Sequence, residues 1–322
     1  MKLNRRHLIV AAAALLGLGG VASAQDDFPN KPIKIIAPFA PGSSDMIARR
    51  LGEHAGKTLG QPFVVETRPG GQGTVASRVI AKSKGDGYTL LLGTNSTHAA
   101  SVHLFKELGY DPVKDFTPII RFTVNPLMLV VRADMPVQTV QEFIKYAKER
   151  PGKLNYGTGN SGSLVAAQML KTQAGIEATG VNYPGNAQAV NDFVAGRLDF
   201  MVTDPLIVKS FVQAGKLRIL GLTSKQRLST FADVVPLAES GLPQFEYASW
   251  IGLFGPAGMP PQVTRKLHEA FAKALADQDN VRFLADIGMI AASSSPAEFD
   301  AYVQDQIKFW GRLTKDAGLT PQ

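Results

Sequence analysis

The sequence predicts an α/β fold with two lobes, in which parallel-rich sheets are flanked by helices and a ligand cleft lies between the lobes. Short β-rich apolar runs alternate with helical patterns from residue 33 to about residue 225, which is typical of parallel sheets with helices on both faces. Two apolar segments, 119–132 and 245–258, are predicted to be the places where the chain crosses between the lobes. We therefore expect 25–124 plus 247–322 to form lobe 1 and 125–246 to form lobe 2.

The expected elements follow from apolar periodicity. The strands are apolar runs bounded by turn residues, at 33–37, 63–66, 88–92, 118–123, 127–132, 153–156, 199–203 and 217–222. The helices between them repeat apolar residues every three or four positions, at 45–58, 74–83, 139–149, 162–174, 186–195 and 205–214. Two further helical stripes, 261–276 and 297–316, follow the second passage.

Residues 1–24 have the pattern of a secretory signal peptide. Lys2, Arg5 and Arg6 precede the apolar stretch LIVAAAALLGL, and Ala22-Ser23-Ala24 forms a small-residue cleavage site. The apolar stretch is too short to span a bilayer. The arginine pair fits twin-arginine export as well as ordinary export. We expect a soluble, exported protein that resides in the periplasm.

Composition narrows the function classes. The net charge of +7 falls to +4 without the three basic residues of 1–24, and no run of lysine or arginine favours nucleic-acid binding. The chain has no cysteine, which excludes disulfides and thiol chemistry. We expect a monomer with no metal and no cofactor.

The segment 33–51, IKIIAPFAPGSSDMIARRL, is the most informative part of the chain. It predicts a strand, a stiff elbow with Pro38 and Pro41, and the first turn of a helix. The elbow would present backbone N–H groups and the hydroxyls of Ser43 and Ser44 at the positive end of a helix dipole, which suits a carboxylate. The alternative is that one of these serines only caps the helix.

Three more polar loops follow predicted strands: GTNSTH at 93–98, GTGNSGS at 157–163 and the loop that starts with Asp204-Pro205. A fourth, PGNAQ at 184–188, follows the run Val181-Asn182-Tyr183. Each one alone is ordinary turn chemistry. Together, at the same end of successive strands, they predict the lining of a cleft for a small, hydrogen-bonded solute.

The GTGNSG sequence at 157–162 also fits G-x-G-x-x-G, with Glu177 at the distance of a ribose-binding acid. We disfavour dinucleotide binding, because Lys153 to Tyr156 is a poor buried first strand. Ser161 lacks the final glycine of a nucleophile elbow.

Two further candidates have simple alternatives. His98 and His103 lack a third metal ligand, so we interpret His98 as a loop histidine near the cleft. Asp204 before Pro205 is typical of a helix N-cap, and it can additionally accept a hydrogen bond from a ligand hydroxyl or amine.

Beyond these motifs, the chain resembles the substrate-binding proteins of the tripartite tricarboxylate transporter family, the Bug-type periplasmic binding proteins. The resemblance covers essentially all of 28–320. It rests on KPIKIIAPFAPGSSD, VVETRPGGQG, GDGYTLLLGT, LGYDPVKDFTPI, YAKERPGKLNYGT, GKLRILGLTSKQR, FADVVPLAESGLP and the W-x-G-L-x-x-P pattern at WIGLFGP.

The resemblance implies a type II periplasmic-binding-protein-like fold that closes on a small carboxylate and delivers it to a membrane permease of the tripartite tricarboxylate type. It implies that the elbow 38–45 holds one carboxylate, and that the loops at 94–98, 157–163, 183–188 and 203–205 select the ligand. Here the family's Pro-Gly-Gly elbow reads Pro41-Gly42-Ser43, so Ser43 can add a hydroxyl contact. The frequent Tyr-Lys-Gly reads Tyr183-Pro184-Gly185, which removes a cation and disfavours tricarboxylates.

The ligand is thus expected to be a mono- or dicarboxylate, including aromatic ones. The alternatives are a ligand sensor for a signalling partner and, third, an exported hydrolase. The candidate ligand-binding residues are Phe39, Ala40, Pro41, Gly42, Ser43, Ser44, Asp45, Thr94, Asn95, Ser96, His98, Thr158, Gly159, Asn160, Ser161, Ser163, Tyr183, Asn186, Thr203 and Asp204.

Overall fold

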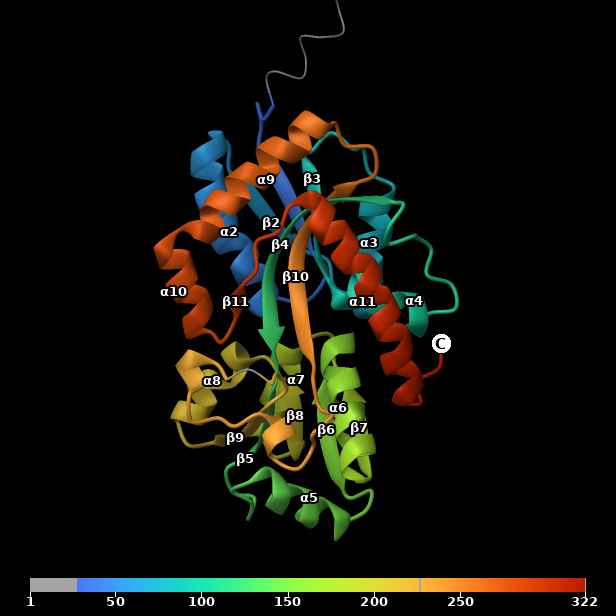
Figure 1. The fold of residues 1–322 in the computed structure, drawn as a ribbon, viewed down its shortest axis with the longest axis vertical. Coiled ribbons are helices and arrows are strands. Elements are labelled where there is room, and N and C mark those ends of the chain that lie inside the picture. The colour runs from blue at the N-terminus through green and yellow to red at the C-terminus, as the bar shows by residue number, and fades with distance from the viewer. Residues whose placement is uncertain (1–27, 226, 322) are drawn as a thin grey trace, which may run out of the picture.

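The computed structural model describes residues 28–225 and 227–321 and places them in two α/β halves, one above the other in Figure 1. We name them the six-stranded half and the five-stranded half after their sheets. The expected signal peptide, residues 1–24, lies outside the described residues. Within the described ranges, no helix is long and apolar enough to cross a membrane.

The six-stranded sheet has the order β11-β4-β10-β3-β1-β2. Neighbouring side chains of its strands point to opposite faces: Ile35 packs with α2 and α9, whereas Ile36 packs with α3 and α11. The strands are β1 (Ile33–Ala37), β2 (Phe63–Thr67), β3 (Thr89–Thr94), β4 (Phe116–Pro126), β10 (Ala248–Pro256) and β11 (Ile290–Ala291). The helices are α2 (Ser43–Leu59), α3 (Thr74–Ala81), α4 (Ser101–Leu104), α9 (Pro261–Ala276), α10 (Gln278–Asp286) and α11 (Pro296–Asp316).

The five-stranded sheet has the order β7-β6-β8-β5-β9. Leu129 faces α5 and α6, and Val130 faces α7 and α8. The strands are β5 (Met128–Arg132), β6 (Leu154–Thr158), β7 (Ala178–Asn182), β8 (Phe200–Thr203) and β9 (Leu217–Leu222). The helices are α5 (Val140–Lys148), α6 (Ser161–Ala174), α7 (Asn186–Val194) and α8 (Pro205–Gln213).

Both sheets are mixed, although strand–helix alternation alone predicts parallel ones. β1 pairs in parallel with β2 and β3, whereas β10 is antiparallel to β3 and β4, and β5 is antiparallel to β8 and β9. The reason is the crossing of the chain between halves. β1, β3 and β8 end where the halves meet, whereas β5 and β10 begin there and run away from the junction.

Several elements were not predicted from the sequence pattern, among them β11, α4 and the three described next. β7 is an edge strand whose residues are mostly exposed, so it shows no alternation of buried and exposed side chains. α10 follows α9 after one residue, with the Asp277 side chain capping its first turn. Residues Ser96–Ala100 form a π-helix directly after β3, where the sequence predicts only a polar loop.

The two halves share a hydrophobic cluster at their junction. Trp310 and Leu313 at the end of α11 pack in the same cluster as Val165 and Leu170 of α6. Trp310 also contacts Tyr247, which immediately precedes β10, at 6.0 Å between ring centroids. Figure 1 shows α11 descending beside both sheets. The C-terminal helix therefore tethers one half to the other.

Candidate functional site between the two halves

A cavity of about 60 Å³ lies where the strands of both sheets end. Thirteen of the predicted residues line it: Phe39, Ala40, Pro41, Gly42, Ser43, Ser44, Thr94, Asn95, Ser96, Gly159, Asn160, Asn186 and Asp204. Eight lining residues were not among the candidates: Asn125, Leu127, Gly185, Ala187, Ile207, Ser249, Trp250 and Ile251. The remaining seven candidates, Asp45, His98, Thr158, Ser161, Ser163, Tyr183 and Thr203, do not line it.

The predicted elbow is the start of α2, and Gly42 is its N-cap. The Gly42 N–H donates to Asp45 Oδ1, and Arg49 Nε donates to the other carboxylate oxygen at 3.3 Å. Asp45 thus caps the helix and does not line the cavity, so its predicted role as a ligand-binding residue stays a prediction. Within the described residues, the N–H and hydroxyl groups of Ser43 and Ser44 have no hydrogen-bond partner. These donors remain available at the cavity wall.

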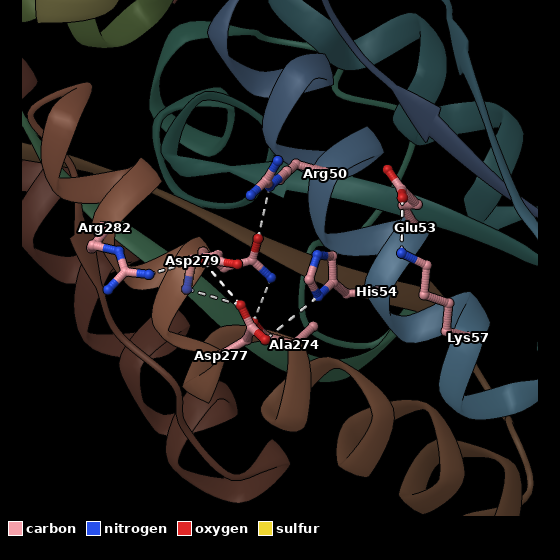
Figure 2. Close-up of polar contacts among 9 residues, drawn as sticks. Arg50, Glu53, His54, Lys57, Ala274, Asp277, Asp279 and Arg282 are labelled. Atoms are coloured by element: carbon pink, nitrogen blue, oxygen red, sulfur yellow. Dashed lines mark hydrogen bonds and ion pairs between the residues drawn. The ribbon is translucent and has the colours of Figure 1, made fainter.

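The far side of α2 is fixed to the six-stranded half. Arg50 Nε donates to Asn280 Oδ1 at 2.8 Å, and Asn280 Nδ2 donates to the Ala274 carbonyl at 2.8 Å. Figure 2 shows Arg50 and His54 facing the turn between α9 and α10, with Asp277 beside them. The buried Asn280 therefore links α2 to that turn, and this anchoring holds the α2 N-terminus in place at the cavity.

Four helices begin at the cavity. The N-caps of α2, α6, α7 and α8 are Gly42, Asn160, Gly185 and Asp204, and all four residues line the cavity. Each helix N-terminus carries roughly half a positive charge. Among the residues that the structure describes, the cavity lining contains no lysine, arginine or histidine. Any positive potential that these residues give the cavity therefore comes from helix dipoles and from N–H and O–H groups.

Most donors at the start of α6 are taken by protein atoms. The Ser163 N–H donates to Asn160 Oδ1 at 2.8 Å, and the Gly159 N–H donates to Asn186 Oδ1 at 2.7 Å. Ser163 Oγ donates to the same Asn186 oxygen at 3.0 Å. Because these donors are occupied, the G-x-G-x-x-G sequence here is a poor cradle for a pyrophosphate, which needs several free N–H groups.

Ser161 joins the two halves instead of lining the cavity. Its N–H donates to Ser96 Oγ at 3.2 Å, and its hydroxyl donates to Gln72 Oε1. Gln72 holds a left-handed backbone conformation with φ of 53°. On another side, Lys209 Nζ donates to the Asp286 carbonyl at 2.8 Å and Thr230 Oγ1 to the Ala285 carbonyl at 2.6 Å. The halves are therefore in contact on more than one side.

His98 is buried in the core beneath the cavity and does not line it, so its predicted contact with the ligand stays a prediction. Its ring stacks on Phe254 at 3.8 Å between centroids, and Nδ1 is 2.9 Å from Thr97 Oγ1. Nε2 is buried without a partner in the described part of the chain. Burial lowers the pKa of His98 to about 3, so the ring is neutral near pH 7.

Three other candidates turn away from the cavity. Thr158 Oγ1 donates to Asn182 Oδ1 at 2.7 Å, and the Tyr183 hydroxyl donates to Asp192 at 2.8 Å. Thr203 is fully buried. Thr158 and Thr203 are the last residues of β6 and β8, and Tyr183 directly follows β7. Strand alternation directs their side chains into a sheet face or toward solvent.

Asp204 lies at the cavity wall as predicted, but its carboxylate does not cap α8. Asn186 Nδ2 donates to Asp204 Oδ2 at 3.3 Å. Burial raises the pKa of this carboxyl above its usual value, and the Asn186 hydrogen bond partly opposes that shift. Within 28–225 and 227–321, Asp204 is thus the one acidic residue in the lining.

The missed lining residues come mainly from the two crossings. Ser249 pairs with Asn125 across the β4–β10 ladder, and Trp250 follows it. The indole N–H of Trp250 and Oδ1 of Asn125 are buried without a partner among the described residues. The sequence shows these segments as crossings. A crossing strand forms the base of the cleft in such a fold, so the signal was present.

Two α/β halves that meet around a small polar cavity define the class of two-lobed binding proteins. The sequence profile of the tripartite tricarboxylate transporter family receptors matches residues 47–319, and the chain belongs to this family. Proteins of the family are periplasmic solute-binding receptors.

Solved structures agree with this assignment. The R. palustris protein Rpa4515, solved with adipate, is 32% identical, with a TM-score of 0.89 over 92% of this chain and 100% of that one. MatC from Rhodopseudomonas palustris, solved with malate, is 32% identical, with a TM-score of 0.84 over 89% and 99%. The periplasmic binding protein BugD is 29% identical, with a TM-score of 0.87 over 92% and 100%.

Proposed function

We propose that this protein captures a small mono- or dicarboxylate, including aromatic ones, in the periplasm and delivers it to a membrane permease of the tripartite tricarboxylate type. The observation that carries the proposal is the meeting of four helix N-termini at one cavity. The described residues that line this cavity include no basic side chain. Dipoles and free N–H groups attract an anion without an ion pair, which suits reversible capture. Adipate and malate in related structures support the ligand class.

In this proposal one carboxylate of the ligand lies at the start of α2. Ser43 and Ser44 would donate through their N–H and hydroxyl groups, because these donors have no other partner within the described residues. The base of the cavity, with Trp250 and Asn125, would contact the ligand's carbon chain and any polar substituent. Binding requires no cofactor and no metal.

Ligand release requires the halves to separate. We propose that lobe 1, 25–124 plus 247–322, and lobe 2, 125–246, move about the crossings near Pro126 and Ala248. The contacts of Ser161 with Ser96 and Gln72 would break on opening. The packing of α11 on α6 would limit the amplitude.

The proposed export of the protein fits the same function. We propose that residues 1–24 are a signal peptide that is removed, and that the mature protein acts as a monomer without nucleic-acid partners. The second candidate is a ligand sensor, which would use the same cavity. Uptake of labelled ligand by cells lacking only this protein separates the two, because loss of a sensor leaves the permease active.

The test is a thermal-shift screen of the mature protein against carboxylates, followed by calorimetry and solution scattering. A ligand that binds only the folded state raises the free energy of unfolding, by about 2.7 kcal/mol when its concentration is a hundred times its Kd. The melting temperature rises as a result. The expected result is a carboxylate that binds with a smaller radius of gyration. Turnover of a bound ester, or no response to any carboxylate, would overturn the proposal.

A further inference from the structure

Two parts of the cavity lining differ in chemistry. From the six-stranded half, Ser43 and Ser44 offer hydrogen-bond donors at the start of α2. From the five-stranded half, Asp204 offers a carboxylate, which is an acceptor when ionised. Among the described residues, no basic side chain in the lining balances that charge. A ligand that contacts both parts meets donors with one group and an acceptor with another.

The residues around Asp204 leave its carboxylate free to contact a ligand. Pro205 follows it at the first position of α8, where an N–H group is missing. The Asp204 side chain makes no capping bond with that helix. Its carboxylate instead receives one side-chain donor, Asn186 Nδ2 at 3.3 Å, and the amide is oriented by the Gly159 N–H at its other end. A carboxylate accepts about four hydrogen bonds, so capacity remains.

A ligand with carboxylates at both ends would set a negative charge beside Asp204 in a partly buried site. Like charges in such a site are destabilising unless a proton or a donor intervenes. A hydroxyl or ammonium group on the ligand supplies that donor, and a hydrogen bond to a charged group is worth about 1.5–3 kcal/mol. A plain carboxylate lacks this contact.

We propose, on the basis of the carboxylate-binding function above, that Asp204 selects ligands carrying a hydroxyl or ammonium group next to the carbon chain, in addition to the carboxylate held at the start of α2. Asp204 is thereby a specificity-determining residue. Hydroxy and amino carboxylates share this chemistry, and the experiment separates them.

The test measures calorimetric affinities of three four-carbon probes that differ in one substituent: succinate, malate and aspartate. Benzoate and 4-hydroxybenzoate form a second pair. Each is titrated into the wild type, Asp204→Asn and a control, Asp305→Asn. Asp305 is an exposed acid on α11 that pairs with Lys308 at 3.1 Å and does not line the cavity. Melting temperatures show that each variant is folded.

In the wild type we expect the donor-bearing member of at least one set to bind at least tenfold more tightly than the plain member. Asp204→Asn should lower that preference at least tenfold and strengthen binding of the plain carboxylate, because a negative charge is lost. Tighter binding of malate than of aspartate identifies a ligand with a hydroxyl group. Tighter binding of aspartate identifies a ligand with an ammonium group. Asp305→Asn should leave the ratios unchanged.

Two results would overturn the inference. Equal binding of plain and donor-bearing probes by the wild type would show that Asp204 does not select, as would a preference that survives in Asp204→Asn. Retention of tight succinate binding by both proteins would show that Asp204 contacts the ligand as a neutral acid. Failure of every probe to bind would instead count against the carboxylate-binding function itself.

Discussion

The starts of α2 and α6 have similar sequences and different roles. Both follow a strand, contain glycine and serine, and begin at the cavity. At α2 the donors of Ser43 and Ser44 have no partner within the described residues, whereas at α6 the corresponding groups bond to Asn160, Asn186 and Ser96. The first is free to hold an anion. The second is part of the joint between the halves.

The difference shows that a glycine–serine helix start indicates available donors only when no neighbour takes them. Asn186 lies 27 residues from Gly159, and Ser96 lies 65 residues from Ser161. These distant partners convert a potential anion site into a contact surface. The same residue types therefore serve ligand binding at α2 and the closed arrangement at α6.

The largest expected effect is on the free energy of unfolding and concerns His98. This residue lies in the π-helix Ser96–Ala100, whose Ser96 accepts a hydrogen bond from Ser161. The pKa of His98 is lowered from 6.5 to about 3 by burial, so the unfolded chain binds a proton that the folded protein excludes between these values. The free energy of unfolding should therefore fall as the pH drops from 6.5 toward 3, by about 3 kcal/mol at pH 4. His98→Phe keeps the aromatic packing and removes this loss.

Urea denaturation of the wild type and of His98→Phe at pH 7 and pH 4 measures this loss of stability. Ligand affinity at pH 7 should stay within about twofold, because His98 does not line the cavity. An identical pH dependence in wild type and variant would show that His98 is not the titrating group.

The next effect compares glycines at the two helix starts. A Cβ on Gly159 would overlap the backbone of Gly185 and Asn186, whereas a Cβ on Gly42 would lie 3.8 Å from the Ala40 carbonyl oxygen and 3.9 Å from Ala187 Cβ. We expect Gly159→Ala to lower the free energy of unfolding by about 2 kcal/mol or more, since backbone must shift. Gly42→Ala should change it by less than about 0.5 kcal/mol. Denaturant titration without ligand would contradict the comparison if both variants were equally stable.

Gly42→Val tests the ligand-binding role of α2. The backbone of Gly42 is extended, with φ of −179°, so any residue can adopt it. The added methyl groups instead point toward Ala187 of the other half. We expect affinity to fall at least about tenfold, or 1.4 kcal/mol, with an unchanged melting temperature of the free protein. Calorimetry on the folded variant measures this, with Gly42→Ala as the control, and an unchanged affinity would remove the elbow from the site.

The smallest effect concerns the joint at α6. Ser161→Ala and Gln72→Ala each remove the same hydrogen bond between the halves. We expect each to weaken ligand binding by about 0.5–1.5 kcal/mol, mainly through faster dissociation. The double variant should be no weaker than either single one, since the pair acts as a unit. Stopped-flow kinetics check this, and additive losses would show that Ser161 contacts the ligand directly.

Much of the fold could be predicted from local patterns. The strand 33–37 and the strand 217–222 are found at the predicted bounds, and Thr89–Thr94 differs by one or two residues, because their apolar runs are bounded by turn residues. The edge strand β7 was missed, since an exposed strand needs no apolar face. The family membership followed from motifs, and the sequence profile confirms it.

The sequence by itself determined the alternation of strands and helices, the two crossings, the family and the polar loops at the strand ends. These depend on side-chain periodicity and on turn residues, which are local properties. Only the tertiary structure decided which of those loops keep free donors and which are occupied. It also brought Trp250 and Asn125 to the base of the cavity. The physical reason is that hydrogen-bond saturation and cavity lining depend on partners distant in the chain, whose approach is set by the packing of the two halves.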